Sequence, residues 1–224
     1  MFESRHSSLI TPRPWDARLA HYLVAPLKDT WVTPNHLTSV RLLIGLAAAA
    51  AFLPGTYAWS NVASFLLVLS NFADHTDGEL ARMSGKTSRI GHIYDLASDA
   101  AVTILLFIGI GIGVATKHSA AFLYPPIVLG AAAGGAIALI FFLRMRIEER
   151  GGKAATQQAS LGGFETEDVL YLVPLVTLCN ALVPFLVVAS ICAPLFAVWV
   201  VIDDLRSERR QRSMRAPADT RVPQ

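Results

Sequence analysis

Long apolar runs recur along this chain, and they constrain its fold more than any other feature. Six of them reach or approach the roughly 20 residues that a helix needs to cross a bilayer: 36–54, 57–83, 88–115, 119–147, 166–184 and 185–206. Only 16% of the residues are charged, whereas a soluble domain usually carries about 25%. Inside a bilayer, backbone polar groups must find partners within the spanning element, which favours helices. We therefore predict an all-α polytopic membrane protein with six transmembrane helices.

The segments that flank these runs are more polar. Residues 13–30 mix Trp15, Leu19 and Tyr22 with basic side chains, a composition typical of a short amphipathic helix on the membrane surface. Residues 207–224 are basic and poor in apolar side chains, which predicts a disordered cytoplasmic tail. The expected organisation is one membrane domain, 1–206, followed by this tail.

Lysine and arginine are distributed unevenly over the connections between the runs. The connections at 54–60 and near 184 contain none, and the connection near 117 contains only Lys117. Nearly all the others lie before the first run, at 82–89, at 144–153 and in the tail. By the positive-inside rule, both termini and the basic loops are cytoplasmic.

Four aspartates stand near the predicted cytoplasmic ends of the second and third spans. At 100° per residue, five residues of the second span fall within an arc of about 140°: Asp74, Asp77, Gly78, Ala81 and Arg82. In the third span, Gly91, Asp95 and Asp99 repeat every four residues and form one stripe. Two helix faces therefore carry paired carboxylates together with small residues.

An aspartate at the centre of a membrane helix costs about 2.5–3.5 kcal/mol, and less near the interface. No lysine or arginine stands three or four residues from Asp74, Asp77 or Asp99 in the same helix, so local ion pairs do not explain the cluster. Two divalent cations would explain it, because hard oxygen ligands suit Mg²⁺ or Mn²⁺.

The spacing of these residues matches a known family. The pattern D-x-x-D-G-x-x-A-R-x8-G-x-x-x-D-x-x-x-D is complete from Asp74 to Asp99, and it resembles the signature of the CDP-alcohol phosphotransferases. The stretch "TPNHLTSVRLLIG", Thr33–Gly45, is similar to the start of that family's first span. In layout the resemblance covers most of the chain: a surface helix, six spans and an internal catalytic face.

The resemblance implies a reaction in which an acceptor hydroxyl attacks the β-phosphorus of a CDP-linked alcohol and CMP leaves. It implies CDP-diacylglycerol as the usual bacterial donor, and an enzyme of the bacterial inner membrane whose active site faces the cytoplasm. By the same resemblance Asp74, Asp77 and Asp95 ligate metal, while Asp99 completes the metal site or takes the acceptor proton. Gly78 would let the nucleotide approach the helix backbone, and Arg82 would face the diphosphate.

Several other polar residues have either a functional or a structural interpretation. Asn35 and Thr38 either shape the nucleotide pocket or cap a helix. Four arginines near cytoplasmic helix ends either bind an acceptor phosphate or anchor the chain at the interface: Arg41, Arg144, Arg146 and Arg206. Arg41 is the strongest candidate for acceptor binding, because it lies inside the first-span match.

Three acidic residues at the start of the fifth run, Glu165, Glu167 and Asp168, either favour the helix dipole or contact the acceptor. His75 and His92 beside the motif are expected to be interfacial or packed side chains.

The acceptor is left open by the sequence. Phosphatidylglycerophosphate synthases usually follow the third aspartate with proline and the fourth with lysine, whereas Leu96 and Ala100 stand here. This departure weakens the prediction of a glycerol-phosphate acceptor. It leaves inositol phosphate, serine, another polyol phosphate or an unusual head group as alternatives. The expected partners are a CDP-linked lipid donor, a polar alcohol and membrane lipid, with no nucleic acid; a homodimer is an open alternative. The rival functions are a metal-dependent hydrolase of CDP-lipids and, more remotely, a transporter, although no inverted repeat is visible.

Overall fold

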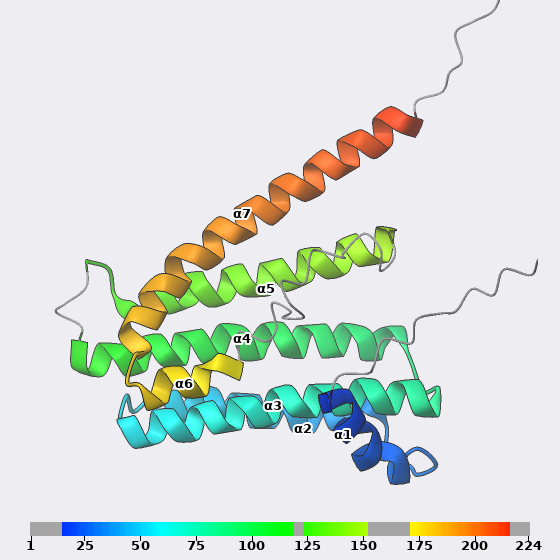
Figure 1. Cartoon of the computed structure of the whole chain (residues 1–224), viewed down its shortest axis with the longest axis horizontal. Helices are drawn as coiled ribbons and strands as arrows, with labels where there is room; N and C mark the ends of the chain where they lie inside the picture. The colour runs from blue at the N-terminus through cyan, green and yellow to red at the C-terminus, as the bar shows by residue number, and fades with distance from the viewer. Residues whose placement is uncertain (1–14, 119–122, 152–170, 216–224) are drawn as a thin grey trace, which may run out of the picture.

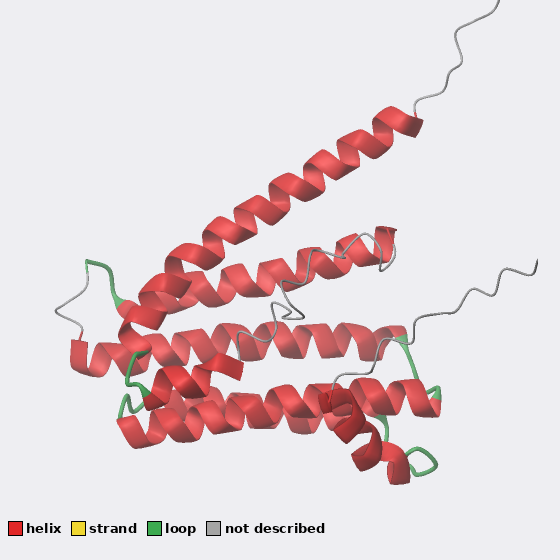
Figure 2. Ribbon diagram, in the orientation of Figure 1, coloured by secondary structure: helices red, strands yellow, loops and turns green. Residues whose placement is uncertain are grey.

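The structure, a computed structural model, describes residues 15–118, 123–151 and 171–215 (Figure 1). Within these residues every regular element is helical (Figure 2). In chain order they are α1 (Trp15–Val24), the 3-10 helix η1 (Ala25–Leu27), α2 (Pro34–Phe52), α3 (Tyr57–Ser84), α4 (Arg89–His118), α5 (Pro126–Gly151), α6 (Val173–Leu178) and α7 (Leu182–Arg215). The predicted all-α class is confirmed.

Local sequence explains where the helices of the motif begin and end. Thr33 caps α2 in a capping box with His36, and Pro34 occupies the first turn, where its missing N–H costs nothing. The Thr56 hydroxyl accepts a hydrogen bond from the Trp59 amide at the start of α3. That helix ends at Gly85, whose φ of 66° suits the left-handed conformation of a C-terminal cap.

From α2 to α5, successive long helices run in opposite directions, whereas α7 runs to the same side as α5 (Figure 1). α2 packs on both α3 and α4, α4 packs on α5, and α5 packs on α7, while α1 lies against α3. The end of α3, the start of α4 and the ends of α5 and α7 point to the same side of the bundle, at the right of Figure 1. The described basic stretches at 82–89 and 144–151 therefore lie at one end of the molecule.

Apolar side chains fill the opposite half of the bundle. Phe52, Leu67, Leu106 and Ile110 are almost completely buried there, and Leu186 of α7 joins them. Gly109 allows close packing, because a Cβ atom at this position of α4 would collide with the Ala49 carbonyl of α2. This contact holds the two helices together beneath the aspartates.

Four helices of the described residues are long and apolar enough to cross a membrane: α2, α4, residues Pro126–Ile147 of α5 and residues Leu182–Arg206 of α7. The predicted second span, 57–83, does form one helix, α3, whose second half is rich in charged residues. The prediction of six spans is thus not confirmed. The coarser prediction, that several helices are long and apolar enough to cross a membrane, is confirmed.

The predicted fifth span, 166–184, differs most from the structure. Its described part consists of the six-residue helix α6 and a turn at Asn180, whose φ is 53°, before α7 begins at Leu182. A helix of this length covers only about 9 Å, so α6 by itself does not span a bilayer. Residues 152–170 lie outside the described part of the chain.

The C-terminal segment also differs from its prediction. α7 continues to Arg215, so the expectation of disorder throughout 207–224 is wrong for its first part. The stretch "SERRQRSMR" explains this result, because arginine, glutamate, glutamine and methionine are good helix formers and can prolong an existing helix.

Candidate functional site

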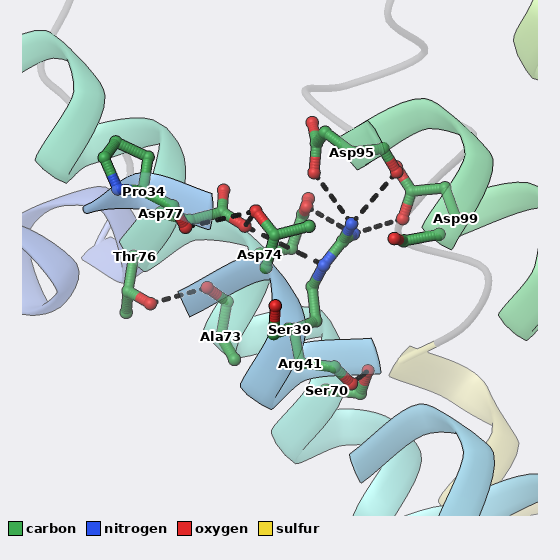
Figure 3. Close-up of polar contacts among 12 residues, drawn as sticks. Pro34, Ser39, Arg41, Ser70, Ala73, Asp74, Thr76, Asp77, Asp95 and Asp99 are labelled. Atoms are coloured by element: carbon green, nitrogen blue, oxygen red, sulfur yellow. Dashed lines mark hydrogen bonds and ion pairs between the residues drawn. The ribbon is translucent and has the colours of Figure 1, made fainter. Parts of the chain in front are cut away.

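Three helices bring the four aspartates of the motif and Arg41 into one cluster, as Figure 3 shows. Asp74 and Asp77 come from α3, Asp95 and Asp99 come from α4, and Arg41 reaches them from α2. The two stripes predicted from helical periodicity therefore do face each other. We refer to these five residues as the aspartate cluster.

The Arg41 guanidinium lies among the carboxylates. Its Nη1 donates to Oδ1 of Asp74 at 2.6 Å and also to Oδ1 of Asp99, and its Nη2 donates to Oδ1 of Asp95 at 2.7 Å. The Asp95 carbonyl accepts a further bond from Nη2 at 3.2 Å. Planar donors in a fork suit several oxygens at once, so one side chain links both acidic helices.

Asp77 occupies a different environment from the other three. Its side chain is 6% exposed, and its Oδ2 accepts a hydrogen bond from the Thr38 hydroxyl at 2.8 Å. The Arg41 Nε lies 3.9 Å from the same oxygen. Thr38 therefore holds a carboxylate of the motif, a contact that the sequence analysis did not predict.

The remaining three carboxylates form an accessible group. Asp74, Asp95 and Asp99 each offer an oxygen within 4.8 Å of the others, and their side chains are 35%, 36% and 40% exposed. Arg41 uses one oxygen of each, which leaves a second oxygen on every carboxylate. Four carboxylates against one guanidinium are an excess of negative charge, and clustered hard oxygens suit a divalent cation.

Arg41 is the functional residue whose position differs most from its prediction. The sequence analysis left Arg41 either as a ligand of an acceptor phosphate or as an interfacial anchor. It found no lysine or arginine three or four residues from Asp74, Asp77 or Asp99 in the same helix. In the structure the Arg41 side chain is 5% exposed and contacts the four carboxylates. Partners from another helix are invisible to an analysis of spacing within one helix, and only packing reveals them.

Gly91 and Asn35 meet at the edge of the cluster. A Cβ atom at Gly91 would lie 2.7 Å from the Asn35 Oδ1 and 3.0 Å from the Ser88 Oγ, so a larger residue would displace its neighbours. Nearby, the hydroxyls of Ser39 and Tyr94 are 3.0 Å apart and link α2 to α4. The small residue thus allows the start of α2 to approach α4 closely.

Glu79 is a polar residue of α3 that the sequence analysis missed. It is 4% exposed, and its Oε2 accepts bonds from Nε and Nη2 of Arg82 at 2.9 and 2.7 Å. Its Oε1 lies 2.8 Å from Nδ1 of His21 on α1. The three-residue spacing of Glu79 and Arg82 was a usable signal, whereas the contact with His21 depends on tertiary packing.

The remaining candidates lie at exposed or packed positions or outside the described part of the chain. Arg146 and Arg206 are exposed near the ends of α5 and α7. The side chain of Arg144 and residues Glu165, Glu167 and Asp168 lie outside the described part of the chain. His75 bonds to the Asn71 carbonyl at 2.9 Å, consistent with a packed histidine, and His92 is exposed.

Comparisons with known proteins agree with the aspartate motif. Residues 31–202 match the profile of the CDP-alcohol phosphatidyltransferase family. An archaetidylinositol phosphate synthase of Pyrococcus horikoshii is 33% identical over 98 residues, which cover 43% of this chain and 50% of the relative. A bifunctional IPC transferase and DIPP synthase of Rubrobacter xylanophilus is 28% identical over 143 residues, covering 64% of this chain and 30% of the relative. The chain thus spans half or less of the length of these curated relatives.

Proposed function

We propose, since the chain belongs to the CDP-alcohol phosphatidyltransferase family, that it transfers a substituted phosphate from a CDP-alcohol to the hydroxyl of a polar alcohol and releases CMP. CDP-diacylglycerol is the donor we propose first. The observation that carries the proposal is the group of three accessible carboxylates, Asp74, Asp95 and Asp99, gathered within 4.8 Å of one another. Phosphoryl transfer depends mainly on positioning and on neutralising charge, which such a group can organise.

The donor set fits divalent cations, and we propose two ions of Mg²⁺ or Mn²⁺. Asp74, Asp95 and Asp99 would hold them with Asp77, because the carboxylates exceed the single guanidinium among them. When bound, such ions would neutralise the negative charge that develops on the leaving phosphate.

The chain's own residues have distinct tasks in this proposal. Arg41 holds the carboxylates of α3 and α4 together, and Thr38 orients Asp77. Asp99, the most exposed of the four aspartates, accepts the proton of the attacking hydroxyl. The nucleotide lies along an edge formed by three small residues and one amide side chain: Gly78, Ala81, Gly91 and Asn35. Arg82 faces the diphosphate.

The acceptor is best sought among polyol phosphates. The name of one relative, archaetidylinositol phosphate synthase, favours an inositol phosphate as the first compound to test. Arg146 and Arg206 are exposed in the C-terminal halves of α5 and α7, whose ends point to the same side as the end of α3 (Figure 1). Cationic side chains of this kind suit a phosphorylated alcohol.

An assay of CMP release tests the reaction. Purified protein is incubated with CDP-diacylglycerol and one candidate alcohol at a time, with Mg²⁺ or with EDTA. We expect CMP only when both the alcohol and the divalent cation are present. CMP formed at an equal rate without alcohol would identify a hydrolase, and full activity after EDTA stripping would contradict the cation site.

A topology experiment tests the proposed placement in the membrane. In a six-span protein of the bacterial inner membrane, reporters fused at Thr87 should read cytoplasmic, and those at Gly55 and His118 should read external. Thr87 follows the end of α3 beside the aspartate cluster, whereas Gly55 and His118 lie at the opposite end of the helices. An external signal at Thr87 would place the active site on the wrong side for cytoplasmic CDP-lipids.

A further inference from the structure

We propose that Glu79 is a positioning residue for Arg82, and that the N-terminal helix α1 contributes to the donor site through His21. The inference rests on the proposed function, in which Arg82 faces the diphosphate of the CDP-alcohol. It adds a buried carboxylate and a helix outside the matched region 31–202 to that site.

Glu79 makes contacts that fix both of its oxygens. Oε2 receives Nε and Nη2 of Arg82, and Oε1 meets Nδ1 of His21 at 2.8 Å. The Glu79 side chain is 5% exposed, whereas that of Arg82 is 66% exposed. The buried Glu79 carboxylate thus binds Nε and Nη2 of Arg82, while the rest of that guanidinium is open to solvent.

The geometry leaves Arg82 able to bind an anion. A guanidinium has five N–H groups, and Glu79 uses two of them, on Nε and Nη2. The remaining three are on Nη1 and Nη2, the edge that recognises phosphate oxygens in a bidentate manner. This edge lies over Gly78, where an added Cβ atom would be 3.7 Å from Nη1. Glu79 therefore presents Arg82 above the glycine of the motif.

α1 completes this arrangement from the side of the membrane surface. Ala20 and Val24 are buried where α1 packs against α3, and Leu19, Tyr22 and Leu23 are exposed. An apolar exposed face of this kind suits the interfacial region of a bilayer. His21 of the same helix contacts Glu79. Packing of α1 on α3 therefore helps to orient the Glu79 carboxylate, which in turn orients Arg82.

A purely stabilising role does not account for these contacts. An ion pair with an exposed partner contributes little to stability, because solvent screens the attraction. A buried carboxylate carries a desolvation cost that an apolar residue at the same position would avoid. Burial of Glu79 beneath an exposed guanidinium therefore supports a role in orienting Arg82.

Binding of CDP with Mg²⁺ to the purified full-length protein, measured by isothermal calorimetry, tests the inference. The variants are Glu79→Gln, His21→Asn, Arg82→Gln and the double variant Glu79→Gln/Arg82→Gln; His118→Asn, an exposed histidine at the other end of α4, is the matched control. We expect Glu79→Gln to raise the Kd of CDP about 10-fold and His21→Asn about 3-fold, with no change for the control. The double variant should bind no more weakly than Arg82→Gln alone, because Glu79 acts through Arg82.

Several outcomes would overturn the inference. Additive effects in the double variant, or an unchanged Kd in Glu79→Gln, would show that Glu79 does not act through Arg82. If Glu79→Gln does not fold, His21→Asn tests the inference instead. A Kd of CDP for His21→Asn equal to that of the unmodified protein would show that α1 does not contribute to the donor site. Failure of the unmodified protein to bind CDP would instead overturn the proposed function itself.

Discussion

Two charged clusters lie on α3, and they differ in their balance of charge. In the aspartate cluster, four carboxylates surround the one guanidinium of Arg41. In the second cluster, the single carboxylate of Glu79 meets the guanidinium of Arg82 and the imidazole of His21. The aspartate cluster therefore has more negative than positive charge, whereas the carboxylate of Glu79 is balanced by the guanidinium of Arg82.

The difference indicates a division of labour between the clusters. A buried or half-buried group of carboxylates is costly unless cations compensate it, so the aspartate cluster is suited to recruit cations from solution. The Glu79 cluster needs none, because its own side chains supply the positive charge. Its contacts instead fix the direction of an exposed arginine, which is a positioning task.

The largest expected effect separates the clusters by turnover. Asp95→Asn keeps the shape of the side chain and removes its charge, so cation binding should fail and kcat for CMP release should drop about 10²- to 10³-fold or more. Asp74→Asn and Asp77→Asn should behave alike. Glu79→Gln should lower kcat far less, because its proposed effect is on donor binding.

Asp203→Asn on α7 is the matched control, since that side chain is exposed and remote from the motif in sequence. Near-normal turnover of Asp95→Asn in folded protein would break the comparison. It would show that the excess carboxylates of the aspartate cluster do not serve as cation ligands.

A second, smaller effect concerns stability. Arg41→Gln leaves the four carboxylates without the protein's own counter-charge, and breaking a buried ion pair typically costs about 3–5 kcal/mol. In EDTA the Tm should fall by about 6–20 °C. Added Mg²⁺ should recover much of this loss, because the ion replaces the missing positive charge; thermal unfolding in detergent measures both values.

Arg41→Lys retains the charge but not the planar fork, so its Tm should lie between those of the other two proteins. Arg146→Gln, an exposed arginine on α5, should leave Tm unchanged. An equal loss of Tm with and without Mg²⁺ would mean that Arg41 supports packing alone and does not balance the charge of the aspartate cluster.

The smallest expected effect sharpens the geometry at the edge of the aspartate cluster. Gly91→Ala places a Cβ atom 2.7 Å from the Asn35 Oδ1, and overpacking of this kind costs about 1–3 kcal/mol. Because Asn35 is exposed and can shift, the KM of the CDP donor should rise about 3- to 10-fold with little change in kcat. Gly135→Ala on α5 has no atom within 4 Å of the added Cβ and is the control; equal KM values in the two variants would remove Asn35 from the donor pocket.

The helical faces of the motif were predictable because they depend on local geometry. The three- and four-residue spacings of Asp74, Asp77, Asp95 and Asp99 place each pair on one helix face, whatever the rest of the chain does. Pro34 marked the start of α2 for the same kind of reason. The number of spans was less predictable, since the break at Asn180 and the extension of α7 to Arg215 depend on turn conformation and helix propagation.

Sequence by itself therefore determined the membrane-grade helices, the two acidic stripes and the family resemblance. Only the tertiary structure decided that Arg41 lies among the carboxylates and that His21 reaches Glu79, pairs separated by 33 to 58 positions in the chain. Spacing within a helix sets the direction of a side chain relative to its own axis. Side-chain packing, such as that at Gly109, sets which helices pack together and how each is rotated about its axis. The packing therefore decides which charged side chains meet.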